Sequence, residues 1–346
     1  MQPMKKTETG SNPTMEDIAG RSGVSISTVS RALAGNPSIS AQTRKNVQRA
    51  AADLGYRMPA QGRSRKKAAT RIVGVVVDAL RNPFLTSMLE YLHDALLEAG
   101  YRITLIIDPM NDSGSLQQLR PMIDGFLDGL IFATATLDSP VVSELKRRGI
   151  PLVLVVRSVD DHGVDTVEID NVHAGMEAAR HLYELGHRRI GLAMGQRNTS
   201  TSRDRAQGAM KRLAEQGMKE KDMPLIWGEY TMESGYSSAM SLLGGRPHVT
   251  AIIAGNDPIA LGAMEAARRS NIAVPDELSI IGFDDMPLSG TQMLALTTIR
   301  QPVEAMARTA ARRLIDRMGG KIPPAPSHDI LPIHLIQRRT TGPAKS

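Results

Sequence analysis

The chain has 346 residues, enough for two or three compact domains at roughly 100 to 200 residues each. Its 41% hydrophobic and 23% charged residues are typical of globular proteins, and the absence of cysteine excludes disulfides, thiolate metal sites and thiol nucleophiles. No stretch approaches the roughly 18 apolar residues of a membrane span, and residues 1–12 contain no apolar signal segment. We therefore expect a cytoplasmic protein with no membrane partner and a disordered leader over residues 1–12.

The basic residues gather near the amino terminus. Residues 1–69 hold 12 Lys and Arg against 4 Asp and Glu, whereas the remaining residues hold 30 and 32. A positive module beside a near-neutral body indicates a polyanion such as double-stranded DNA as partner for the module and a different partner for the body.

Residues 13–57 predict three short helices that close a small all-α domain. The first lies around residues 15–22, and Gly23 makes the following turn. In the second, Ser25 is the expected cap, and the apolar residues Val29 and Leu33, four positions apart, form the buried side. The third begins after Ser40 and places Val47, Ala51 and Leu54 on one face. This arrangement is typical of a helix-turn-helix head.

Residues 58–70 read as a basic hinge or linker. They contain MPAQGRSRKKAAT, with no large aliphatic residue after Met58 and a cluster of cations that includes Arg63 and Arg65. From the residues alone, a plain disordered tether is an equal alternative.

From residue 71 onward, apolar runs alternate with amphipathic stretches. The runs RIVGVVVDA, YRITLIID and GLIFATAT, separated by helical patterns, predict a parallel sheet with right-handed crossovers. The same rhythm restarts near residue 187 with RRIGLAMG, LIWGEY, VTAIIAGND and LSIIGFDD, followed by a helix and a last strand over HDILPIHLIQRR. We therefore expect an α/β body made of two doubly wound parallel-sheet subdomains.

The second short helix has a polar face that suits contact with DNA. At 100° per residue, Ser27, Ser30 and Arg31 fall on one arc with Ile26 at its edge, opposite the apolar side. In a helix-turn-helix the second helix enters the major groove, and an arginine there binds guanine O6 and N7 bidentately. The alternative for Arg31 is an ordinary solvated surface arginine.

The stretch TMEDIAGRSGVSISTVSRALAGNPSISAQTRKNVQRAAADLGYR resembles the DNA-binding head of the LacI/GalR family of bacterial transcriptional repressors. The likeness covers nearly the whole chain, because RIVGVVV, RNPFL, ELGHRRIGLAMG, RDRAQG, GNDPIALGAM, PDELSIIGFDD and LTTIRQP follow in the family's order. The resemblance implies a repressor that binds a pseudo-palindromic operator as a homodimer. It also implies control by a small-molecule effector, a sugar or a related polar or anionic metabolite.

By the same resemblance, the body is of periplasmic-binding-protein type and clamps the effector between its subdomains. Residues 71–346 then form the effector-binding and dimerisation domain. The family's pattern gives the first subdomain residues 71–167 and 297–327, and the second subdomain residues 168–296 and 328–341. No leucine heptad follows Arg339, so a dimer is expected rather than a tetramer.

Site residues follow from the family's pattern, position by position. The head positions that match base contacts are Ile26, Ser27 and Arg31, and those that match phosphate contacts are Ser25, Thr28 and Ser30. The matching effector-binding positions are Asn82, Phe84, Arg205, Tyr230 and Asp257, with Arg157 and Gln301 as weaker candidates. Asp257 is expected to face Arg205 across the cleft, although a helix cap beside Pro258 is an even alternative. For Phe84 and Tyr230 the alternative is core packing.

The hinge departs from the family. Members typically carry PNxxARSL there, and the leucine wedges into the minor groove. This chain has MPAQGRSR instead, with Arg65 in the leucine's place and Gly62 weakening any helix. We expect Arg63 and Arg65 to contact the minor groove or phosphate, with less bending of the operator and stronger salt dependence.

Other functions fit less well. The strand and helix rhythm alone permits a Rossmann-type enzyme, but GxGxxG after a strand, GxxxxGK[ST], GxSxG and HExxH are all absent, and no cofactor, metal or catalytic residue is predicted. A non-regulatory small-molecule binding protein would lack the basic head. A co-repressor-dependent regulator or an activator of the same family stays open, because the sign of coupling depends on which state the ligand prefers.

Overall fold

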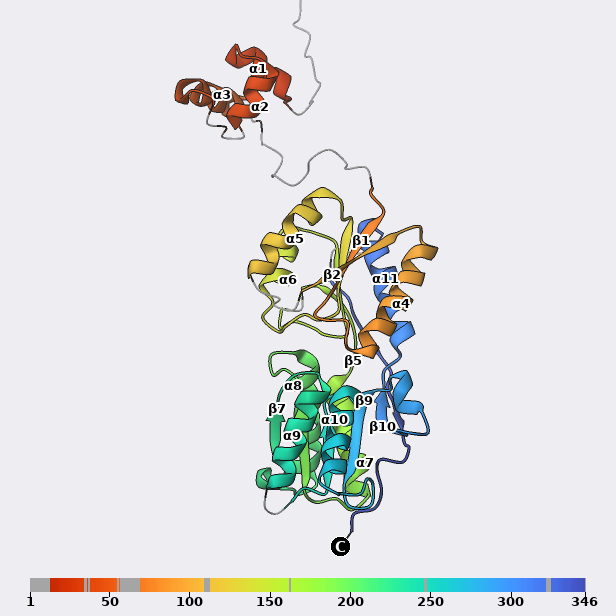
Figure 1. Cartoon of the computed structure of the whole chain (residues 1–346). Coiled ribbons are helices and arrows are strands. Elements are labelled where there is room, and N and C mark those ends of the chain that lie inside the picture. The colour runs from red at the N-terminus through yellow and green to blue at the C-terminus, as the bar shows by residue number, and fades with distance from the viewer. Residues whose placement is uncertain are drawn as a thin grey trace, which may run out of the picture. The chain divides into compact units, whose positions relative to one another are not determined.

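The computed structural model describes residues 13–33, 36, 38–54, 56, 69–108, 113–161, 163–245, 248–321 and 325–345. The chain divides into two compact units, a head within Met1–Ala68 and a body, Ala69–Ser346 (Figure 1). The predicted leader over residues 1–12 and the hinge residues Arg63 and Arg65 lie outside the described residues.

The head contains the three predicted helices, α1 at Met15–Ser22, α2 at Ile26–Leu33 and α3 at Ala41–Asp53 (Figure 1). Gly23 ends α1 with a φ of 71°, a left-handed conformation that glycine adopts without steric cost. The three helices bury one small apolar cluster, made of Ile18, Val29, Ala32, Val47, Ala50 and Ala51.

Side chains cap all three helices of the head. Thr14 forms a capping box over the first turn of α1. The Oγ of Ser25 accepts from the Thr28 N–H at 3.2 Å, and the Oγ of Ser40 accepts from the Thr43 N–H at the same distance. The predicted caps at Ser25 and Ser40 are therefore confirmed.

In the first subdomain of the body, six parallel strands run in the order β11-β5-β4-β3-β1-β2. These strands are β1 Ile72–Val77, β2 Arg102–Ile107, β3 Gly129–Phe132, β4 Leu152–Val155, β5 Asp165–Ile169 and β11 His328–Leu331. The helices are α4 Pro83–Glu98, α5 Ser113–Gly125, α6 Pro140–Arg147 and α11 Val303–Met318.

The second subdomain repeats this plan in the order β12-β10-β9-β8-β6-β7, with only β12 antiparallel to its neighbour β10 among the described strands. Its strands are β6 Ile190–Met194, β7 Leu225–Trp227, β8 Ala251–Ala254, β9 Ser279–Asp284, β10 Thr297–Arg300 and β12 His334–Ile336. The helices are α7 Asn171–Glu184, α8 Ser200–Glu215, α9 Met232–Gly244 and α10 Asp257–Arg269, with short 3-10 turns η1 Glu220–Asp222 and η2 Pro287–Gly290.

Helices cover both faces of each sheet. In the first sheet, α4 and α11 lie on one face and α5 and α6 on the other (Figure 1). Neighbouring strand residues point to opposite faces, and accordingly Val75 packs with α4 and α11 whereas Val76 packs with α5 and α6. In the second sheet Leu192 packs with α7 and α8, and Ala193 with α9 and α10. Two doubly wound subdomains follow, as the sequence predicted.

Strand pairing corrects two of the predicted subdomain boundaries. Residues 297–300 were assigned to the first subdomain, but as β10 they pair with β9 in the second sheet. Residues 328–331 were assigned to the second subdomain, but as β11 they pair with β5 in the first sheet. The predicted last strand is therefore two strands in different sheets, separated at Pro332, which lacks the N–H needed to continue a ladder.

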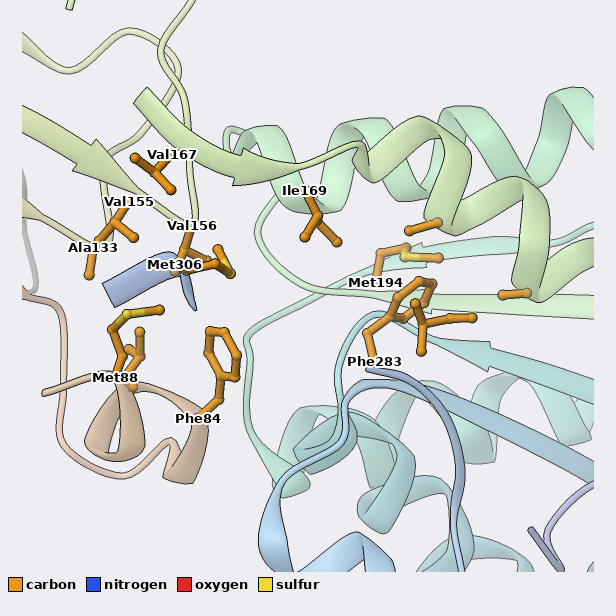
Figure 2. Packing of buried hydrophobic residues seen from close by; sticks show 14 of the residues in the cluster. Phe84, Met88, Ala133, Val155, Val156, Val167, Ile169, Met194, Phe283 and Met306 are labelled. Atoms are coloured by element: carbon orange, nitrogen blue, oxygen red, sulfur yellow. The ribbon is translucent and has the colours of Figure 1, made fainter. Parts of the chain in front are cut away.

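The two subdomains share one cluster of buried hydrophobic residues at their junction (Figure 2). Phe84 and Val156 come from the first subdomain, and Met194 and Phe283 come from the second. Because the chain crosses this junction after β5, after β10 and after β11, the apolar cluster lies beside three connecting segments.

Candidate functional site

The outer face of α2 is the first candidate site. The helix buries Val29 and Ala32, and it exposes the predicted contact residues Ser25, Ile26, Ser27, Ser30 and Arg31, with Thr28 half-buried beside them. Ile26 is 46% exposed, so its apolar side chain is available for contact. The Arg31 guanidinium makes no hydrogen bond or ion pair with any residue that the structure describes. The face thus presents hydroxyls, an apolar group and an unpaired cation.

The second candidate site is an inner chamber of about 20 Å³ between the two subdomains of the body. Six of the seven predicted effector residues line it, together with six others: Asn82, Phe84, Leu85, Ala133, Val156, Arg157, Thr201, Arg205, Tyr230, Asn256, Asp284 and Gln301. Strand ends and helix starts from both subdomains therefore converge there, as in other open α/β sheets.

Arg205 is the main buried cation of the inner chamber, at 2% exposure. Its Nε donates to Asn171 Oδ1 at 3.0 Å, and its Nη1 donates to the Gly255 carbonyl at 2.7 Å. The guanidinium lies 4.6 Å from the centre of the Phe283 ring and 3.8 Å from Asp284 Oδ1. Burial lowers the pKa of Arg205, although a guanidinium stays charged at any physiological pH.

Close packing of α7 on α8 places Arg205. A Cβ on Gly175 of α7 would lie 2.1 Å from the Arg205 carbonyl oxygen, and a Cβ on Gly208 of α8 would lie 1.9 Å from the Val172 carbonyl oxygen. Both positions therefore need glycine to let the two backbones approach. The motif RDRAQG, which identified Arg205 in the sequence, ends in Gly208 and therefore includes one of these two glycines.

The acid facing Arg205 is Asp284, which corrects the prediction for Asp257. Asp284 is the last residue of β9 and accepts from Gln301 Nε2 at 2.7 Å. Asp257 is fully buried, and its oxygens accept from Thr298 Oγ1, Ser289 Oγ and the Met286 N–H at 2.6 to 3.0 Å. Its carboxylate therefore ties the segment after β9 to β10.

The alternative role for Asp257, a helix cap, is also not found. Asn256 caps α10, with its Oδ1 accepting from the Ile259 N–H at 3.0 Å. Burial raises the pKa of Asp284 to about 6, and burial with the nearby Asp284 charge raises that of Asp257 to about 7. The two carboxyls thus share one desolvated environment.

Tyr230 and Arg157 both line the inner chamber, and Arg157 also lines the cleft outside it. The Tyr230 hydroxyl lies 2.6 to 2.7 Å from the hydroxyls of Thr199, Thr201 and Ser202. The Arg157 guanidinium lies 4.8 Å from the centre of the Tyr230 ring and 3.5 Å from Asp78. Arg157, a weaker effector-binding candidate from the sequence, lines both spaces.

Asn82 and Phe84 begin the helix that closes the first-subdomain side. Asn82 caps α4, its Oδ1 accepting from the Phe84 N–H at 3.0 Å, and Phe84 is 4% exposed. Phe84 packs in the core and also lines the inner chamber. Core packing and a place in the effector site are therefore compatible for this residue.

Two amide groups of the inner chamber have no protein partner among the described residues. These are Oε1 of Gln301 and Nδ2 of Asn256, both on side chains that are at most 2% exposed. Their orientation is fixed, because the other amide atom of each side chain is hydrogen bonded. Buried polar atoms of this kind usually meet a partner, so one acceptor and one donor point to a ligand or solvent group.

An outer chamber of about 490 Å³ lies on the other side of Arg157. It is lined by Asp78, Asp108, Thr134, Thr136, Arg157, Gln196, Arg197, Asn198, Trp227, Gly228 and Glu229. Only Arg157 of these was predicted. The signal was present, because Asp78, Asp108 and Gln196 follow β1, β2 and β6, and ligands bind at strand carboxyl ends.

Backbone strain gathers at the inner chamber. Val156 has a φ of 73° and Asp284 a φ of 111°, and both residues line it. A β-branched residue at positive φ is unfavourable, and such strain persists where the surroundings hold it in place, often at ligand sites.

Three hydrogen bonds join the subdomains beside the chambers. The Leu137 N–H donates to the Asn198 carbonyl at 2.8 Å, and the Ser158 N–H donates to Ser200 Oγ at 2.9 Å. Arg203 pairs with Asp160 at 2.8 Å. The start of α8 is therefore bound to the first subdomain.

Known proteins share both parts of this architecture. Residues 14–58 match the bacterial regulatory proteins of the lacI family, and residues 179–341 match a periplasmic binding protein-like domain. The chain is 33% identical to the HTH-type transcriptional regulator MalR of Streptomyces coelicolor, over 95% of this chain and 97% of that one. It is also 33% identical to the HTH-type transcriptional repressor CytR of Escherichia coli K12, over 92% of each.

A solved structure of the transcriptional regulator CelR in complex with cellobiose has a TM-score of 0.73 and 30% identity, covering 95% of this chain and 99% of that one. A helix-turn-helix head on a periplasmic-binding-protein-like body defines a class of DNA-binding transcriptional regulators, which are not enzymes. The chain belongs to the LacI family of bacterial regulatory proteins. Over the described residues, no helix is long and apolar enough to cross a membrane.

Proposed function

We propose that the chain is a repressor that binds a pseudo-palindromic operator as a homodimer, under the control of an effector held between the body subdomains. The exposed face of α2, on which Arg31 has no partner among the described residues, carries this proposal. The second helix of such a head enters the major groove. Action on DNA gives the protein a cytoplasmic location.

The residues of α2 divide by chemistry. Ile26, Ser27 and Arg31 contact base edges, with Arg31 reading guanine and Ile26 resting on a thymine methyl group. Ser25, Thr28 and Ser30 hold phosphates through short hydroxyls, which fix the register of the helix in the groove. Hydroxyls this short reach the DNA only if the helix lies close to it.

Arg63 and Arg65, outside the described residues, are proposed to contact the minor groove or phosphate without a leucine wedge. A circular-permutation assay on the selected operator measures the bend. A weak bend with steep salt dependence is expected, and a strong central kink would contradict this role.

Exposed apolar side chains support the dimer. In the first subdomain Leu97, Leu105 and Ile107 are 38% to 53% exposed, the last two on the edge strand β2. In the second subdomain Leu288 and Met293 are 57% and 90% exposed beside an apolar groove of about 590 Å³. A monomer rarely leaves two such surfaces open, and a second copy related by a two-fold axis would cover both.

Sedimentation equilibrium tests this interface. Met293→Glu places a charge in the groove and is expected to raise the dimer dissociation constant at least tenfold. Ile330→Glu is the matched control, because Ile330 is 57% exposed on β11, at the opposite edge of the first sheet from β2, and does not line the groove. An equal effect of the two variants would contradict the proposed interface.

The effector is proposed to be a sugar or a related polar metabolite, contacted by Asn82, Phe84, Arg157, Arg205, Tyr230 and Gln301, with Asp284 in the place predicted for Asp257. Convergence of both subdomains on these residues supports the proposal. Binding there biases subdomain closure, and closure biases head placement.

In vitro selection of genomic fragments with the purified chain, near physiological salt, tests the function. An enriched palindrome is expected, with half-sites that follow the two-fold symmetry of the dimer. DNA retained at low salt without any enriched sequence would contradict sequence-specific binding by the protein alone and favour a co-repressor-dependent regulator. Enrichment with increased rather than reduced transcription in a reconstituted assay would identify an activator.

A further inference from the structure

The outer chamber is larger than the inner chamber. Its volume of about 490 Å³ falls within the ~300 to 1,000 Å³ of small-molecule sites. The inner chamber, at about 20 Å³, has room for a group of the size of one water molecule. The larger part of a ligand therefore finds its space in the outer chamber, with one small group in the inner chamber.

The charge of the outer chamber disfavours an anion. Three carboxylates, those of Asp78, Asp108 and Glu229, line it against the two guanidinium groups of Arg157 and Arg197. Deeper in, the Arg205 cation is balanced by Asp284. A phosphate or carboxylate would face more negative than positive charge, so the chamber suits a neutral ligand.

The remaining lining groups suit a molecule with many hydroxyls. Carboxylates such as Asp78 and Glu229 accept hydrogen bonds, and amides such as Gln196 and Asn198 both donate and accept. Trp227, at the end of β7, is half-buried and adds an aromatic surface. Polar groups around one aromatic ring match a sugar, whose rim is polar and whose ring face carries C–H groups.

Two groups deeper in complete this description. Gln301 Oε1 and Asn256 Nδ2 offer one acceptor and one donor without protein partners among the described residues. A hydroxyl in the inner chamber would find this acceptor and this donor there, and Arg157 lines both spaces. One sugar ring would leave much of the outer chamber to water, since the chamber holds on the order of sixteen waters at ~30 Å³ each.

We propose that the outer chamber binds a neutral oligosaccharide of two or more rings, with one ring on the indole of Trp227 and one hydroxyl reaching Gln301 and Asn256. This inference rests on the proposed effector-binding function of the body and narrows its ligand. It excludes phosphorylated sugars and sugar acids, which the sequence left open.

Trp227 also provides the readout, because it is the only tryptophan in the chain. The full-length protein is titrated with maltose, cellobiose, trehalose and lactose, with glucose and galactose, and with glucose 6-phosphate, followed by tryptophan emission and by calorimetry. We expect at least one disaccharide to change the emission and to bind at least tenfold more tightly than its monosaccharide units and than the phosphate.

Three variants locate the ring. Trp227→Ala is expected to weaken the best disaccharide at least tenfold, and Trp227→Phe, which keeps an aromatic face, is expected to restore most of the affinity. Tyr183→Ala is the matched control, because Tyr183 is a half-buried aromatic on α7 that lines neither chamber. Equal effects of Trp227→Ala and Tyr183→Ala would overturn the proposal.

Two further results would also overturn it. One is that no neutral saccharide of the panel binds, and the other is that a monosaccharide or glucose 6-phosphate binds as tightly as every disaccharide. Operator titrations then distinguish a wrong ligand class from the absence of effector control. If a phosphorylated sugar releases the operator, effector control stands and only the ligand class is wrong.

Discussion

The head and the body present their functional residues in opposite ways. In the head, Ser27 and Arg31 are exposed on α2 and the core lies behind them. In the body, Arg205 and Asp284 are almost fully buried, and each is bonded to several other groups. Binding and stability are therefore separable in the head and coupled in the body.

This difference determines what a substitution does. An exposed side chain contributes little to folding, so replacing it changes recognition alone. A buried cation or carboxylate cannot be removed without leaving its partner uncompensated, so replacing it changes folding as well. The four predictions below test this separation.

Arg205→Ala gives the largest expected effect. It leaves Asp284 and Asn171 without their buried cationic partner, and the free energy of unfolding of the body is expected to fall by about 3 to 5 kcal/mol. Urea denaturation measures it. The control is Arg268→Ala, an exposed arginine paired with Glu265, for which a change below ~1 kcal/mol is expected. A similar effect of both variants would mean that the body does not couple its site to its stability.

Ile18→Ala and Ile26→Ala form a matched pair in the head. Ile18 is fully buried, and its truncation is expected to lower the free energy of unfolding of the head by about 2 to 5 kcal/mol. Ile26 is 46% exposed, and its truncation is expected to leave head stability within ~0.5 kcal/mol while weakening operator binding. Differential scanning calorimetry measures the stability of both variants, and titration calorimetry measures operator binding. A strong loss of stability in Ile26→Ala would place that residue in the core.

Arg31→Ala is expected to reduce operator affinity by about 1 to 3 kcal/mol and to relax one operator position, with head stability unchanged. Fluorescence anisotropy with the selected operator and its single-base variants measures both effects. Uniform weakening across all variants would make Arg31 a phosphate contact instead.

The pH dependence of body stability is the smallest of the four effects. Burial raises the pKa of Asp257 to about 7 and of Asp284 to about 6, so the folded state holds more protons than the unfolded state between pH ~4 and ~7. Their contribution therefore falls as pH rises through this window. Burial lowers the pKa of His181 and His187, which acts in the opposite sense below pH ~6.5.

Asp257→Asn isolates the carboxylate contribution. The stability difference between the wild-type chain and this variant is expected to decrease as pH rises from 5 to 8, because only the wild type loses a buried proton there. Thermal unfolding at each pH measures it. A constant difference would mean that Asp257 is already ionised at pH 5.

Much of the fold could be predicted from local sequence. The head helices follow from caps and apolar spacing, and the seven named apolar runs of the body each contain one of the strands β1, β2, β3, β6, β7, β8 and β9. No strand was named between residues 137 and 187, where β4 and β5 lie. The tail was misassigned because HDILPIHLIQRR reads as one apolar run, and only pairing partners show that its halves lie in different sheets.

The candidate site in the body was predictable only in part. Gly175 and Gly208 fix Arg205 through backbone contact, so its motif pointed to a real constraint. Asp257 and Asp284 each stand at the end of an apolar run, in AIIAGND and SIIGFDD. The sequence alone therefore does not show which of the two faces Arg205. Their hydrogen bonds separate them, because the oxygens of Asp257 accept from Met286, Ser289 and Thr298, whereas Asp284 lies beside Arg205.

Directed cleavage of the operator tests most directly that the outer face of α2 reads DNA. The chain has no cysteine, so Ser27→Cys carries one tethered iron chelate on that face, and Asp53→Cys carries it at the end of α3. The account predicts two symmetric clusters of cleavage in the major groove of the selected palindrome from Ser27→Cys, and weaker or displaced cleavage from Asp53→Cys. No cleavage from Ser27→Cys on a bound operator, or the same pattern from both variants, would contradict it.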